Sequence, residues 1–114
     1  MPVETSTATP DTVTKPAIDM ELLVLSDAEL EKPYRVIIEN DDVTPMDFVV
    51  AVLVTIFQLT VDQAADVMLE AHHSGHALVV VLPLQEAQER VYAAHSAARD
   101  SGYPLSFYIE PEVS

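Results

Sequence analysis

Hydrophobic and polar positions follow one another in a regular order after residue 33, and they predict three strands. Tyr34–Ile38 alternates and is rich in β-branched residues, which predicts a strand that ends in a polar turn at residues 39–42. Residues 76–82 form an almost continuous apolar run that is typical of a central strand. Residues 105–109 predict a last strand.

The segment between the first two strands predicts two helices. Thr44 as the N-cap, Pro45 at the first helical position and the acid Asp47 predict a helix from Pro45 to about Gln58. It is apolar nearly all round, so we expect other elements to cover most of its sides. The run 60–63 fits a capping box and predicts a second helix, which Gly75 ends.

A third helix is expected between the last two strands. Pro83 begins it, apolar residues follow at spacings of three and four, and Gly102 ends it. The order β-α-α-β-α-β predicts an α+β fold, in which helices cover a small three-stranded antiparallel sheet. We expect this compact core domain to span residues 34–114.

Residues 1–33 differ from the rest in composition. They hold four of the eight prolines and seven acids, so we expect a flexible, disordered acidic N-terminal extension. The short apolar run Met20–Leu25 leaves two interpretations open, a transiently sticky piece of tail or a segment that docks weakly.

Charge narrows the classes of function. The 114 residues carry 5 Lys and Arg against 19 Asp and Glu, a formal net charge of −14. Phosphate backbones and anionic membrane surfaces repel such a chain, so we expect neither nucleic acid nor a membrane as partner. Self-repulsion favours a monomer. No run reaches the roughly 18 apolar residues of a membrane span, and residues 1–10 lack the pattern of a secretory signal, which predicts a cytoplasmic protein.

The sequence contains few of the residue patterns that catalysis or metal binding requires. The chain has no cysteine, which excludes a disulfide scaffold, a thiolate zinc site and a cysteine nucleophile. His72 and His76 are four residues apart, but Gly75 should break the helix that would bring them to one face. No Gly-x-Ser-x-Gly motif marks a hydrolase. We therefore expect no enzyme activity, no cofactor and no metal.

Two polar features remain as candidate sites. Asn40, Asp41 and Asp42 form a loop before the most apolar helix, either as a solvated Asx turn or as part of a site. On the second helix, His72 continues the apolar stripe of Met68 and Ala71. It is either a satisfied core histidine or a polar group at the mouth of an apolar pocket.

The run Pro33–Val49, followed by Met68, Leu69, His72 and Gly75, resembles the ClpS adaptor family. The resemblance covers about residues 34–110. It implies an adaptor that binds proteins with a destabilising first residue, namely Leu, Phe, Tyr or Trp. Such an adaptor delivers these N-degron proteins to a Clp AAA+ protease and is not itself an enzyme.

The resemblance also implies roles for individual residues. Asn40, Asp41 and His72 would bind the free α-amino group of the substrate. A hydrophobic pocket for its side chain would be formed by Thr44, Met46, Val49, Met68, Ala71 and Leu105. The N-domain of the Clp ATPase would dock near the start of the third helix, where Gln85 replaces the usual acid, Glu86 lies beside it and Arg90 supplies the base. The N-terminal extension would be engaged by the ATPase during hand-over.

Two rival hypotheses stay open at this point. A plain protein-interaction module could use the same α+β fold without recognising N-terminal residues, because a fold does not determine a function. It would not need Asn40, Asp41 and His72 to lie together. The second rival is a histidine metal site.

Overall fold

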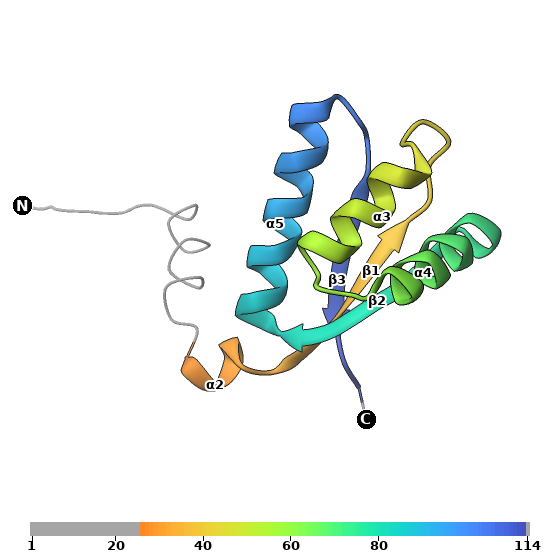
Figure 1. The fold of residues 1–114 in the computed structure, drawn as a ribbon. Helices are drawn as coiled ribbons and strands as arrows, with labels where there is room; N and C mark the ends of the chain where they lie inside the picture. Colours follow the sequence, from red (N-terminus) through yellow and green to blue (C-terminus); the bar gives the residue numbers. More distant parts are fainter. Residues whose placement is uncertain (1–25, 114) are drawn as a thin grey trace, which may run out of the picture. The chain divides into compact units, whose positions relative to one another are not determined.

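The computed structural model describes residues 26–113 (Figure 1). The elements in chain order are α2 Asp27–Leu30, β1 Pro33–Glu39, α3 Met46–Thr55, α4 Val61–Ser74, β2 His76–Pro83, α5 Leu84–Ser101 and β3 Ser106–Pro111. The described residues from 31 onward belong to one compact unit. Most of the predicted extension, including Met20–Leu25, lies outside the described residues. Its described part contains the single helical turn α2, which Ser26 caps by accepting from the Glu29 N–H at 3.1 Å.

The sheet has the strand order β2-β1-β3, and both pairings are antiparallel. The predicted α+β fold with a three-stranded antiparallel sheet is thus confirmed. The central strand is β1, whose residues 36–38 are buried. The prediction of residues 76–82 as a central strand was wrong, because β2 forms an edge of the sheet. The continuous apolar run suggested burial on both faces of the strand. In the structure one face is buried, with Ala77 and Val79, whereas Leu78 on the other face is 43% exposed.

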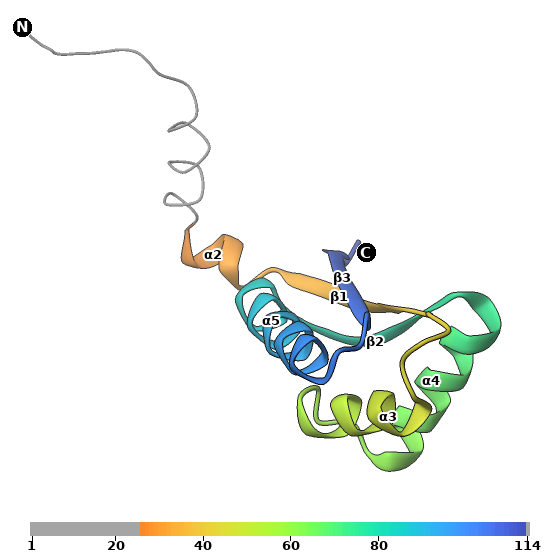
Figure 2. The ribbon, with the colours of Figure 1, turned by 90° about the horizontal axis from the view of Figure 1, so that it is seen from above.

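The three long helices α3, α4 and α5 lie on the same side of the sheet, as Figure 2 shows. Alternation along β1 sends Val36 and Ile38 into the core that these helices close. The buried core is made mostly of small and branched side chains: Val36, Ile38, Val49, Val52, Leu53, Phe57, Ala64, Ala71, Ala77, Val79, Ala87, Ala94, Ala98, Leu105 and Phe107. No helix in the described part of the chain is long and apolar enough to cross a membrane.

The helix α3 is less covered and shorter than predicted. Only three of its ten residues, Val49, Val52 and Leu53, are buried, because α3 lies on the outside of the domain and turns one face to the sheet. It stops at Thr55 instead of about Gln58. Gln58 has the positive φ of 62°, which ends a helix. The other two helices follow their predicted signals.

The start of α4 is held as its sequence predicts. The Thr60 hydroxyl accepts from the Gln63 N–H at 3.1 Å, and the Gln63 side chain accepts from the Thr60 N–H at 2.9 Å. This capping box satisfies two N–H groups that the first helical turn leaves free. At the other end, Gly75 adopts a φ of 92°, a conformation that favours glycine. Both ends of α4 are therefore fixed, and α4 forms one side of the cavity described below.

Candidate functional site

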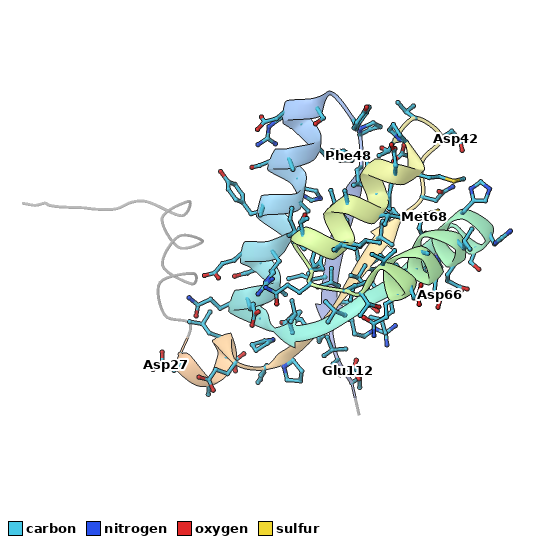
Figure 3. The ribbon with its side chains drawn as sticks, in the orientation of Figure 1. Asp27, Asp42, Phe48, Asp66, Met68 and Glu112 are labelled. Atoms are coloured by element: carbon cyan, nitrogen blue, oxygen red, sulfur yellow. The ribbon has the colours of Figure 1, made fainter. Side chains whose placement is uncertain are left out.

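A cavity of about 160 Å³ lies where the end of β1, the loop after it, the first turns of α3, the second half of α4 and Leu105, just before β3, meet. In Figure 3, Asp42 lies on the loop between β1 and α3, and Met68 lies on α4 beside α3. The lining consists of Ile38, Glu39, Asn40, Asp41, Asp42, Thr44, Met46, Val49, Met68, Ala71, His72 and Leu105. The structure thus brings together all nine residues expected at the α-amino site and in the hydrophobic pocket.

The lining also contains three residues that were not expected in the pocket. Ile38 is the last inward-facing residue of β1, and its alternation with Val36 was the available signal. Glu39 and Asp42 flank the two polar residues that the sequence did indicate. Their position at the rim follows from the turn of the loop, which the sequence alone does not define.

Asp41 organises the loop through its own side chain. Its Oδ1 accepts from the Val43 N–H at 2.8 Å and from the Thr44 N–H at 2.7 Å, while its Oδ2 accepts from the Thr44 hydroxyl at 2.9 Å. Thr44 was predicted to cap α3, and this was wrong. Pro45 occupies the N-cap position without a side-chain cap, because the Thr44 hydroxyl donates to a charged acceptor instead.

The Asp41 carboxyl is held in its ionised form. Burial alone would raise the pKa of Asp41, but the hydrogen bonds from Thr44 and Val43 outweigh it and lower the pKa below the ordinary 3.8. A carboxylate has about four acceptor positions, and the loop uses three of them. One position on Oδ2 is left for a cationic donor in the cavity.

This pKa shift predicts a pH dependence of stability. Because the folded-state pKa lies below 3.8, ionised Asp41 stabilises the folded protein above about pH 4, and this stabilisation is lost as the pH falls through the folded-state value. The difference in unfolding free energy between wild type and Asp41→Asn should therefore be constant near neutral pH and shrink below about pH 4. Urea unfolding of both proteins at several pH values measures it. A difference that does not change with pH would contradict this assignment.

Asn40 links the loop to the end of α4. Its backbone N–H donates to the Gly75 carbonyl at 2.9 Å, so the start of the loop is tied to the turn that follows His72. Its side chain is exposed and lines the cavity. In the described residues, neither the Asn40 amide nor the His72 ring makes a side-chain hydrogen bond, which leaves both available to a ligand.

His72 lies at the rim of the cavity, not in the buried stripe of α4. The interpretation of His72 as a core histidine was wrong, because its side chain is exposed and Ala71, 3% exposed, takes the inward position. Val61, at the other end of α4, is 64% exposed. The His72 ring lies 5.5 Å from that of His73, which donates through Nδ1 to the Leu69 carbonyl at 3.0 Å.

The inner part of the cavity is apolar. Val49, Ala71 and Leu105 are nearly fully buried there, while Met46 is 51% exposed. Cavities of roughly 150 Å³ lined by aliphatic side chains bind benzene. A space of about 160 Å³ therefore suits one large apolar side chain. Among residues 26–113, no group of three His, Asp or Glu side chains is arranged to hold a metal ion.

The residues expected to dock an ATPase lie on α5, away from the cavity lining. Arg90 forms an ion pair with Glu86 at 2.8 Å and donates a second hydrogen bond to the Ile56 carbonyl. It therefore places positive charge at the C-terminal end of α3, where the helix dipole favours it. Gln85 is exposed and donates to Glu89 at 3.5 Å.

The family model and the related proteins that match this chain all name the same family. The family model described as "ATP-dependent Clp protease adaptor protein ClpS" matches residues 29–108. An adapter protein ClpS of Nitratidesulfovibrio vulgaris (strain DP4) is 40% identical over 90 residues, which are 79% of this chain and 86% of the relative. ClpS 1 of Rhodopseudomonas palustris is 46% identical over 84 residues, 74% and 82% of the two chains.

A solved structure shows the same fold. Agrobacterium tumefaciens ClpS2, bound to L-phenylalaninamide, superposes with a TM-score of 0.69 at 39% identity and covers 72% of this chain and 99% of its own. The family model extends over most of the described domain and includes every residue of the cavity lining. This chain therefore belongs to the ClpS family of ATP-dependent Clp protease adaptors.

Proposed function

We propose that the cavity binds the first residue of a protein substrate, through its free α-amino group and its side chain. Substrates would begin with a large apolar or aromatic residue, namely Leu, Phe, Tyr or Trp. The adaptor would then deliver them to a Clp AAA+ protease without catalysing a reaction itself. The observation that carries the proposal is one small cavity with a polar, partly anionic rim and an apolar interior.

The rim matches the chemistry of an α-ammonium group. This cation has three N–H donors and needs acceptors from several directions. Asp41 offers a charged acceptor position, Asn40 an amide oxygen and His72 a ring nitrogen. Because Asp41 is fixed by three hydrogen bonds before any ligand arrives, little ordering is needed on binding.

The expected affinity follows from the same contacts. Charge-assisted hydrogen bonds contribute roughly 1.5–3 kcal/mol each, and burying one large apolar side chain adds roughly 1.5–3 kcal/mol. The sum reaches about −8 kcal/mol, a micromolar dissociation constant, when the site is preformed. An acetylated N-terminus loses its positive charge, so we expect it to bind poorly.

The ligand of the solved relative agrees with this chemistry. L-phenylalaninamide, bound by Agrobacterium tumefaciens ClpS2, carries a free α-amino group, a benzyl side chain and an amide in place of the next peptide bond. Calorimetric titration of the present protein should use it beside two close analogues. L-alaninamide keeps the amine and loses the large side chain, and 3-phenylpropanamide keeps the ring and loses the amine. Both should bind at least about tenfold more weakly. Equal binding of all three would contradict the proposal.

A protonated His72 would oppose binding of an α-ammonium group. Protonation would remove its acceptor nitrogen and place a second cation beside the α-ammonium group. Affinity for a peptide with a free N-terminal leucine should therefore be lower at pH 5 than at pH 7, and the peptide amine is charged at both values. In His72→Gln, which keeps an acceptor, most of this change should disappear. Anisotropy titrations at both pH values measure it, and an equal fall in the variant would remove His72 from this role.

Delivery of the bound substrate to the protease would use surfaces outside the cavity. We propose that the first two turns of α5, with the exposed Gln85 and the half-buried Glu86 and Arg90, dock on the N-domain of a Clp ATPase. We also propose that residues 1–33 form the flexible extension which the ATPase engages. Arg90 then has two tasks, because it also holds the end of α3. We propose a monomer, which self-repulsion at a net charge of −14 supports, acting in the cytoplasm.

A further inference from the structure

We infer that His95, on α5, is a positioning residue for the binding cavity. Its ring nitrogen Nε2 accepts the Phe107 N–H of β3 at 2.9 Å. A backbone N–H only donates, so Nε2 carries no hydrogen and the ring is neutral, with its hydrogen on Nδ1. Among the residues described, β3 has no strand on its other side. His95 therefore satisfies an amide of an edge strand that would otherwise depend on water.

Phe107 sits between two residues that line the cavity. Leu105, just before β3, precedes Phe107 by two positions and belongs to the same buried core, and Ile38 is the partner of Phe107 in β1. All three are at most 5% exposed. A shift of β3 at Phe107 must therefore move the wall against which the substrate side chain packs.

Aromatic contacts extend this connection across the domain. The Phe107 ring lies 5.1 Å from that of Phe57, just after α3, and 6.0 Å from the His95 ring. These three rings join α5, β3 and the end of α3 in one packed row. The hydrogen bond from the Phe107 N–H to His95 therefore fixes this row of rings next to the part of the cavity wall that Leu105 and Ile38 form.

The hollow beside His95 is lined by a cation and not by a carboxylate. His95 lines this shallow hollow with Arg99, Gly102, Tyr103, Pro104, Leu105 and Ser106. The charged group of this lining is the Arg99 cation of α5, and the other titratable group is the Tyr103 phenol. From β1, the Glu39 carboxylate contacts the Ser106 hydroxyl at 3.2 Å and not the His95 ring. Protonation of the His95 ring would thus convert its acceptor atom Nε2 into a donor that faces the Phe107 N–H, which is also a donor.

The first test is spectroscopic and needs no ligand. Nitrogen-15 NMR of the His95 ring should show the tautomer with hydrogen on Nδ1 at pH 7.5. Acidification toward about pH 5 should reduce the hydrogen-exchange protection of the Phe107 amide and shift the Leu105 methyl signals together. In His95→Gln, whose amide oxygen still accepts, both changes should be largely absent. The opposite tautomer, or equal changes in the variant, would overturn the inference.

The second test measures binding and therefore rests on the proposed function. At pH 7.5, His95→Leu should shift the Leu105 methyl signals and weaken binding of a free N-terminal leucine peptide by about three- to tenfold. His95→Gln should stay within about twofold of wild type. His76→Gln, at an exposed histidine of β2 outside the cavity lining, is the matched control.

The two tests separate the inference from the proposed function. If the wild type binds the peptide and His95→Leu binds equally well, the inference is wrong. If the wild type binds no peptide, the proposed function fails, and the tautomer and the Leu105 shift still decide the role of His95. If His95→Leu does not fold, the comparison of wild type with His95→Gln in acid decides it.

Discussion

Asp41→Asn is expected to lower the affinity for a peptide with a free N-terminal leucine by about 10- to 150-fold, without unfolding the protein. The asparagine side chain has the same shape, and its oxygen can still accept from the Val43 and Thr44 N–H groups. What disappears is the negative charge beside the α-ammonium group, worth roughly 1.5–3 kcal/mol for a charge-assisted hydrogen bond. Asp41→Ala would be less informative, because it would also remove the hydrogen bonds that shape the loop.

Asp42→Asn is the matched control for this prediction. It changes the net charge by the same amount one residue away and also lies in the cavity lining, but no loop hydrogen bond depends on its carboxylate in the described structure. Its effect on affinity should be within about threefold. Equal losses in the two variants would mean that the charge of the rim matters and that the position of Asp41 does not.

Ala71→Leu should block the apolar part of the cavity. The Ala71 side chain is buried and faces a space of about 160 Å³, so three added carbon atoms would occupy the room of the substrate side chain. Losing the burial of a large first residue costs roughly 1.5–3 kcal/mol, or about 10- to 150-fold in affinity. Peptides beginning with Phe or Trp should lose most, as anisotropy titrations with a set of first residues would measure.

The fold of Ala71→Leu should persist, because the cavity accepts the added volume with little overpacking. Ala65→Leu provides the comparison, since Ala65 lies on the same helix, is half-buried and does not line the cavity. It should leave peptide affinity unchanged. Unchanged binding of aromatic first residues in a folded Ala71→Leu protein would show that the side chain is bound elsewhere.

Local signals in the sequence account for most of the fold. The capping box of Thr60 and Gln63 and the terminating Gly75 and Gly102 act within a few residues of themselves, so they could be interpreted without tertiary structure. The position of β2 in the sheet could not be predicted from such local signals. One face of its apolar run packs against the helices, and the other leaves Leu78 and Val81 exposed. The sequence alone does not distinguish this case from burial on both faces.

The site was predictable in its membership and less so in its geometry. Family resemblance pointed to nine residues that the structure gathers around one cavity. Thr44 could not be assigned from its position, because two acceptors compete for its hydroxyl and only the loop geometry decides for Asp41. His72 was misplaced since one helical position, about 100°, separates a buried side chain from one at the rim. The contact of His95 with Phe107 joins positions 12 residues apart and had no local signal.

The measurement that tests the central claim most directly is fluorescence anisotropy with two labelled peptides of identical sequence. They differ only in a free or an acetylated N-terminal leucine, so they share every contact except those of the charged amine. The account predicts binding of the free form in the micromolar range, with the acetylated form weaker by at least about tenfold. Equal affinity for the two peptides, or no binding of either, would contradict recognition of the N-terminal residue and favour a plain protein-interaction module.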